Sequence, residues 1–180
     1  MNPSYNVKFK QWLLTEPWSV GGSRRGVKIL NYIRELRELV GTRPIIMAGA
    51  CVILIDDEGR LLLQQRTDNG LWGLPGGSME PGENMKEVAS RELFEEVGLK
   101  AEELELLDIF SGPELYYRYP HGDEVYNVVA AYICKEYSGI IKGDEAEVQD
   151  IRFFDLNKIP NQISPPDLPI ITRFLNEVRS

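Results

Sequence analysis

A glycine-rich loop that leads into a well-bounded helix constrains this chain more than any other feature. Asn84 followed by Glu87 is a capping-box pattern, which satisfies the first free amides of a helix, and Gly98 supplies the stop at the other end. In the loop before the helix, Gly76 and Gly77 are adjacent, and backbone without side chains can approach a ligand or a metal closely. A plain turn between a strand and the helix is the alternative. Local chemistry therefore predicts a helix from Asn84 up to Gly98, preceded by a loop able to contact a ligand.

Three carboxylates share one face of that helix, beside its apolar stripe. Glu92, Glu95 and Glu96 stand at positions i, i+3 and i+4, so they project into one sector. Without a counter-charge they would repel one another, and some would stay protonated. A bound cation resolves this, and ligands made only of oxygen favour Mg²⁺ or Mn²⁺ over Zn²⁺. The alternative is a solvated helix in which Arg91 forms i,i+4 pairs with Glu87 and Glu95 for stability alone.

The rest of the chain shows strand and helix patterns in mixed order. Apolar patterns predict strands over residues 48–55, 60–65, 104–110, 125–134 and 151–154, and helices over 27–40 and 169–178. Turn residues at 56–59 predict that the first two strands form a hairpin. The nearly continuous apolar run of 125–134 predicts a central position in the sheet. Residues 69–77 are expected to be a loop and 160–169 a connector.

Composition and charge exclude several classes of function. The 180 residues include 28 acids and 20 bases, and the net charge of -8 opposes binding to nucleic-acid polymers and to anionic membranes. Cys51 and Cys134 lie in apolar runs and are expected to be buried free thiols of a reducing compartment. His121 is the single histidine, which argues against a zinc site. No leader is recognised, and the longest apolar run is too short to cross a bilayer, so we expect a soluble, cytoplasmic protein.

The loop and helix together resemble the Nudix box, the signature of the Nudix hydrolase family. The box reads Gly-x5-Glu-x7-Arg-Glu-U-x-Glu-Glu-x-Gly-U, where U is an aliphatic residue. Every defined position is filled, by Gly77, Glu83, Arg91, Glu92, Leu93, Glu95, Glu96, Gly98 and Leu99. The resemblance covers roughly residues 45–157 and does not reach the N-terminal arm.

The resemblance implies a fold, a domain organisation and a reaction. The expected fold class is α/β (α+β), a Nudix-type α/β/α sandwich around a mixed β-sheet. Residues 1–43 would form an N-terminal arm and amphipathic helix, and residues 44–180 the hydrolase domain with its C-terminal helix. Family members hydrolyse a pyrophosphate bond in a nucleoside diphosphate derivative with Mg²⁺ or Mn²⁺. A homodimer formed through residues 1–40 is a further expectation.

The resemblance also assigns roles by position. The implied metal ligands are the carbonyl of Gly77 and the carboxylates of Glu92, Glu95 and Glu96, and Glu92 is the first candidate for the general base. Arg91 would orient these glutamates by ion pairing.

Family members often add one more acid from a loop before the last strand. Asp144, Glu145 and Glu147 lie where that acid would fall. We choose Glu147 as a further metal ligand, and an ordinary acidic loop is the alternative.

The sequence favours an ADP-ribose-like substrate slightly. Within the family, a proline some distance past the box is associated with ADP-ribose, and Pro113 fits that position. A tyrosine slightly later is associated with dinucleoside polyphosphates, and Tyr116 or Tyr117 fits there. The alternatives are therefore a dinucleoside polyphosphate or nucleoside triphosphate pyrophosphohydrolase, or a non-catalytic nucleotide-sensing module.

Three residues are candidates for direct contact with the substrate. Arg66 and Arg118 are able to bind a phosphate, although surface arginines are commonly only solvated. Tyr116 is able to stack on a base, as are the other tyrosines at 117, 119 and 126, and packing within the loop is the alternative for each.

Overall fold

The computed structural model describes residues 32–144 and 146–179, and it combines helices with strands in mixed order. The helices are α2 (Tyr32–Val40), α3 (Met85–Val97) and α4 (Leu168–Val178), with a short 3₁₀ turn at Pro113–Leu115. Helix α2 falls within the range predicted for residues 27–40, of which 27–31 lie outside the described residues. The arm of residues 1–26 also lies outside them. No helix among the described residues is long and apolar enough to cross a membrane.

The larger sheet is mixed, as expected. Its order is β4 (Gly76–Ser78), β1 (Ile45–Leu54), β8 (Glu124–Cys134) and β6 (Glu105–Phe110), and β7 (Tyr116–Arg118) also pairs with β8. Strands β1 and β8 run parallel, whereas the other pairs are antiparallel. Strand β8 is central, which confirms the prediction from its apolar run.

Two smaller sheets complete the strands. One has the order β10 (Val148–Phe154), β2 (Leu61–Arg66) and β3 (Trp72–Gly73), and the other joins β5 (Leu99–Ala101) to β9 (Tyr137–Gly139). The prediction that residues 69–77 are only loop is therefore wrong, because β3 lies within them and β4 begins at Gly76. Gly76 and Gly77 pair with β1, and Trp72 pairs with β2.

The predicted hairpin of the first two strands is also wrong. The turn forms as expected, with Asp56 accepting hydrogen bonds from the amides of Glu58 and Arg60. Beyond a single bridge between Ile55 and Leu61, however, β1 and β2 part into different sheets. The edges of β1 are taken by β4 and β8, so β2 pairs with β10 and β3 instead.

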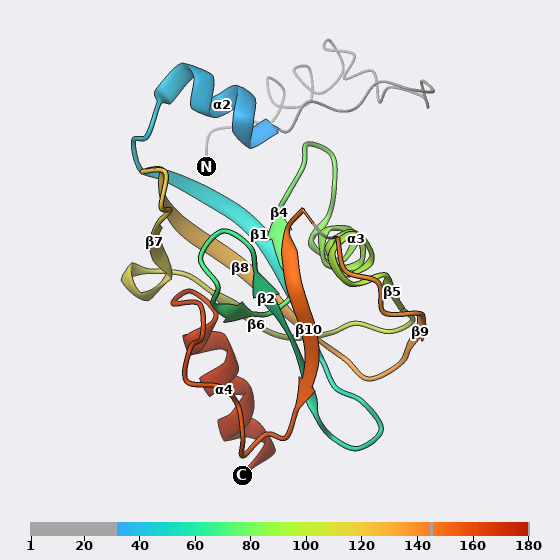
Figure 1. The fold of residues 1–180 in the computed structure, drawn as a ribbon. Helices are drawn as coiled ribbons and strands as arrows, with labels where there is room; N and C mark the ends of the chain where they lie inside the picture. Colours follow the sequence, from blue (N-terminus) through green and yellow to red (C-terminus); the bar gives the residue numbers. More distant parts are fainter. Residues whose placement is uncertain (1–31, 145, 180) are drawn as a thin grey trace, which may run out of the picture. The chain divides into compact units, whose positions relative to one another are not determined.

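Strand β1 separates two apolar cores, one that includes α3 and one that includes α4. Figure 1 shows these two helices on opposite sides of the strands. Ala50, Val52 and Leu54 pack in the core that contains α3 residues such as Leu93. The alternate residues of β1 pack in the core that contains α4; they are Cys51, Ile53 and Ile55. This alternation is that of a strand buried on both faces, and it confirms the α/β/α arrangement. Cys51 and Cys134 are buried free thiols, as expected.

Candidate active site at the glycine loop and helix α3

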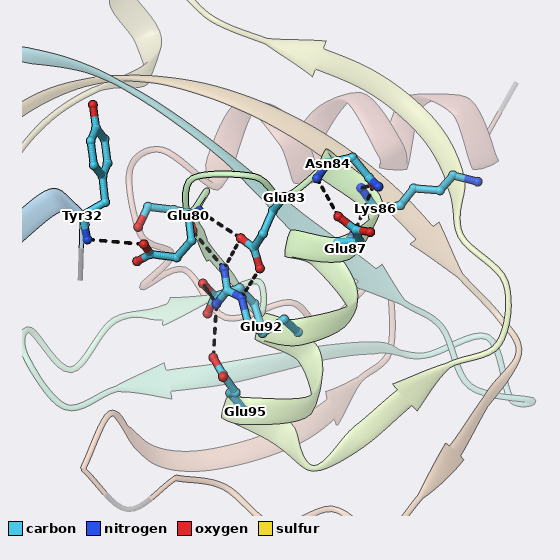
Figure 2. A network of polar contacts seen from close by, with 10 residues as sticks. Tyr32, Glu80, Glu83, Asn84, Lys86, Glu87, Glu92 and Glu95 are labelled. Atoms are coloured by element: carbon cyan, nitrogen blue, oxygen red, sulfur yellow. Dashed lines mark hydrogen bonds and ion pairs between the residues drawn. The ribbon is translucent and has the colours of Figure 1, made fainter. Parts of the chain in front are cut away.

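Helix α3 is held in place by the local chemistry that its sequence predicted. The Asn84 side chain accepts hydrogen bonds from the amides of Lys86 and Glu87, and the Glu87 carboxylate accepts one from the Asn84 amide (Figure 2). At the other end, Gly98 adopts the left-handed conformation with φ 80° and donates to the Phe94 carbonyl at 2.9 Å. The helix therefore begins and ends at fixed residues, which fixes the direction of its glutamates.

Glu96 is turned inward, toward the glycine loop. Only 6% of the residue is exposed, and its Oε2 accepts hydrogen bonds from the Gly76 amide at 2.8 Å and from Gln64 Nε2 at 2.7 Å. Burial raises the pKa of Glu96 to about 8, against the opposing effect of these two hydrogen bonds, and the charge of Glu92 raises it further. Burial therefore favours the protonated form of Glu96, and a bound cation would favour its ionised form.

The loop backbone lies close to its neighbours at two glycines, to a side chain at Gly77 and to backbone at Gly49. A Cβ placed on Gly77 would overlap the carboxylate of Glu92. A Cβ on Gly49, on the neighbouring strand β1, would overlap the carbonyl oxygen of Gly77. The structure thus brings the Gly77 backbone and the Glu92 side chain together, as predicted, and adds Gly49, which the sequence did not single out.

Arg91 binds three of the four acids of the box, all except Glu96. It donates to Glu83 at 2.6 and 2.9 Å, to Glu92 at 2.7 Å and to Glu95 at 3.1 Å. Figure 2 labels these three glutamates within the network of polar contacts. A further bond at 3.1 Å reaches the carbonyl of Ser78 and so ties the helix to the loop. Hydrogen bonding to Arg91 lowers the pKa of Glu83. The Glu92 side chain is 13% exposed and burial raises its pKa, whereas the Glu95 side chain is 58% exposed.

The donor set suits a hard divalent cation, although its members are not gathered around one point. Among the described residues, no group of three or more His, Cys, Asp or Glu side chains is arranged to hold a metal ion. The chemistry nevertheless fits, since carboxylate and carbonyl oxygens are the ligands that Mg²⁺ and Mn²⁺ take. In addition, Gln64 Oε1 is a buried acceptor with no hydrogen-bond partner in the described part of the chain. Glu147 is exposed, and its charge contributes to the raised pKa of Glu92, so the two carboxylates are within electrostatic reach.

A cavity of about 100 Å³ adjoins the glycine loop. Its lining includes Gly76, Gly77, Arg66, Tyr119 and Asp167. Arg66 is held by hydrogen bonds of 2.9 and 3.0 Å to the carboxylate of Asp68. Burial raises the pKa of Asp167 to about 6, and the charge of Arg66 opposes that rise. Of the three predicted substrate-binding residues, the structure places Arg66 at this cavity.

The other two, Tyr116 and Arg118, are not among the residues that line it. Tyr116 donates to Glu124 at 2.9 Å and its ring lies 5.2 Å from that of Tyr126. Arg118 is exposed on the same short strand. The tyrosine that lines the cavity is Tyr119, which the sequence placed among four equivalent candidates. Asp167 was missed, because it lies in a segment that the sequence showed only as a proline-rich connector.

A larger, open groove of about 950 Å³ runs along another side of α3. Its lining includes Phe94, Glu95, Ile140 and Ile141 and no residue of the glycine loop. The small cavity borders Gly76, Gly77 and Arg66, whereas the larger groove borders Glu95 of the box.

Comparison with known proteins agrees with this geometry. The family model described as NUDIX domain matches residues 46–174. An ADP-ribose pyrophosphatase of Methanocaldococcus jannaschii is 37% identical over 111 residues, which cover 59% of this chain and 61% of that protein. The NAD-capped RNA hydrolase NudC of Chromobacterium violaceum is 32% identical over 122 residues, which cover 66% of this chain and 42% of that protein. The chain thus spans less than two thirds of the length of these relatives.

Solved structures show the same fold. A MutT NUDIX hydrolase from Burkholderia pseudomallei superposes with a TM-score of 0.62 at 23% identity, covering 72% of this chain and 98% of that one. The NUDIX domain of Shewanella oneidensis NrtR, solved with ADP ribose, gives a TM-score of 0.59 at 21% identity and covers 80% of this chain and 98% of that one. With the family model extending over most of the sequence, these findings show that the chain belongs to the Nudix family.

Proposed function

We propose that this chain is a Mg²⁺- or Mn²⁺-dependent hydrolase that cleaves the pyrophosphate bond of a nucleoside diphosphate derivative. The observation that carries the proposal is the meeting of the α3 glutamates with the backbone of Gly76 and Gly77, next to a cavity lined by Arg66. The names of the relatives from M. jannaschii and C. violaceum support this class of reaction. Residues 44–180 would be the catalytic domain.

The metal would be held by the Gly77 carbonyl and by Glu92, Glu95, Glu96 and Glu147. A divalent cation bound there would neutralise pyrophosphate charge and make a water molecule more acidic. In-line attack on phosphorus then depends mainly on positioning and charge.

The chain's own residues would supply that positioning. Glu92 would accept the proton of the attacking water, since its largely buried carboxylate lies against the Gly77 backbone. Arg91 would keep Glu92 and Glu95 in place through the bonds described above. Arg66 would bind a substrate phosphate from the wall of the cavity.

An ADP-ribose-like substrate is favoured over a dinucleoside polyphosphate. The name of the M. jannaschii relative, an ADP-ribose pyrophosphatase, supports the ADP-ribose-like substrate. The case for a dinucleoside polyphosphate depended on Tyr116 or Tyr117, and neither residue lines the cavity, whereas Arg66 does. Tyr116 bonds to Glu124, and Tyr117 accepts a hydrogen bond from Asn69. These contacts are those of loop packing.

The test is hydrolysis of a substrate panel with Mg²⁺ and with Mn²⁺, with products separated by chromatography. The panel contains ADP-ribose, dinucleoside polyphosphates, nucleoside triphosphates and nucleotide sugars, and we expect ADP-ribose to have the highest kcat/KM. Glu96→Gln should abolish hydrolysis while the circular dichroism spectrum stays native, and Glu105→Gln, an exposed residue of β6, is the matched control. Unchanged turnover by Glu96→Gln would refute the metal site, and no turnover of any substrate by the wild type would favour a non-catalytic module.

A further inference from the structure

Gln64 is a polar residue at a fully buried position, where an apolar residue would be expected. It is 2% exposed and follows Leu61, Leu62 and Leu63, which are fully buried, along strand β2. Leu62 packs in the core under α3, whereas Leu61 and Leu63 pack in the core under α4. Because side chains alternate along a strand, Gln64 shares the face of Leu62 and points toward α3.

The buried amide is only half satisfied. Its Nε2 donates to Glu96 Oε2 at 2.7 Å, but its Oε1 accepts no hydrogen bond within the described residues. An unsatisfied buried acceptor lowers stability relative to an apolar side chain of the same shape. The core therefore does not explain a glutamine at this position, whereas the bond to Glu96 does.

That bond falls on the same oxygen as the bond from the glycine loop. Gly76 N and Gln64 Nε2 both donate to Glu96 Oε2, from two different strands. Two donors on one oxygen fix the plane of a carboxylate and leave its other oxygen, Oε1, as the one available for a further ligand. Through this direct hydrogen bond, Gln64 thus controls the orientation of a proposed metal ligand.

We propose that Gln64 is a positioning residue that orients the Glu96 carboxylate for binding a divalent cation. The inference rests on the proposed function, since it concerns the same metal. Residues that hydrogen-bond to metal ligands commonly change metal affinity by about 10- to 100-fold when they are replaced. A role confined to packing has the opposite signature, because it changes stability and leaves metal affinity alone.

The test compares Gln64→Met, which keeps the shape and removes the amide, with the control Gln65→Met. Gln65 is the next residue of β2, half-buried, and bonds to the Gly70 carbonyl instead of a carboxylate. Binding of Mn²⁺ alone to each metal-free full-length protein is measured by electron paramagnetic resonance, without substrate. Thermal unfolding is measured in parallel in EDTA.

We expect the Mn²⁺ dissociation constant of Gln64→Met to rise about tenfold or more over wild type and control. Its melting temperature should stay within about 4 °C of wild type. Equal Mn²⁺ affinity in Gln64→Met and wild type, with hydrolysis intact in the wild type, would overturn this inference and leave the proposed function standing. Absence of Mn²⁺ binding by the wild type would overturn both. A larger drop in melting temperature in both Gln64→Met and Gln64→Leu would assign the residue to the core and overturn the inference.

Discussion

The buried carboxyl of Glu96 should make the metal-free protein less stable as the pH rises. Its pKa is about 8 in the folded protein and close to the ordinary value of 4.5 when unfolded. Below pH 4.5 the group is protonated in both states. Between 4.5 and 8 the folded state binds a proton that the unfolded state has released, so the free energy of unfolding falls as the pH increases through this range. A divalent cation should restore stability, and more at pH 8 than at pH 6, because it binds the ionised form.

The size of the effect follows from that range. Each pH unit between the two pKa values changes the free energy of unfolding by about 1.4 kcal/mol. The decrease due to Glu96 between pH 5 and pH 8.5 is therefore about 4 kcal/mol. Asp167 and Glu92 also have raised pKa values and contribute in the same direction. Only the difference between wild type and Glu96→Gln therefore isolates the Glu96 contribution.

The assay is urea unfolding of both proteins in EDTA, at intervals from pH 5 to pH 8.5. Over this interval the free energy of unfolding of the wild type should fall by about 4 kcal/mol more than that of Glu96→Gln. If both proteins showed the same dependence on pH, Glu96 would be ionised at neutral pH without a cation. Burial would then not raise the pKa of Glu96 as expected.

Two further substitutions test the packing of the loop and the role of the arginine. In Gly49→Ala the new Cβ would overlap the Gly77 carbonyl, so the free energy of unfolding in urea should fall by about 1–3 kcal/mol and Mn²⁺ should bind more weakly. Wild-type values for both would show that the loop moves freely. Arg91→Lys keeps the charge but loses the two-pronged geometry with which the guanidinium binds Glu83. The pKa of Glu83, followed by a carboxyl NMR titration, should therefore rise toward its ordinary value. The kcat/KM should fall about tenfold or more. An unchanged Glu83 titration would refute the assignment of Arg91 as the group that lowers this pKa.

Local chemistry explains which parts of the fold were predictable. Helix α3 begins at Asn84 and ends at Gly98 because caps act within one turn of the chain, and sequence neighbours suffice to recognise them. The continuous apolar run of β8 likewise marks a strand buried on both faces. The turn at residues 56–59 was also correctly predicted. Its flanking strands did not pair as a hairpin, because β4 and β8, distant in the chain, compete for the edges of β1.

Within the site, too, local sequence signals were recognisable and contacts between distant strands were not. The box residues Glu92 and Glu96 were found because one helix presents them at regular spacing. Gln64 and Gly49 come from other strands, and their roles depend on which strand faces α3 and which lies against the loop. The sequence signal for Gln64 is a polar residue that directly follows three leucines, and it can be interpreted only when the face of β2 that packs against α3 is known. Since the sequence predicted a hairpin that does not form, the contact between Gln64 and Glu96 became visible only when the strands were placed.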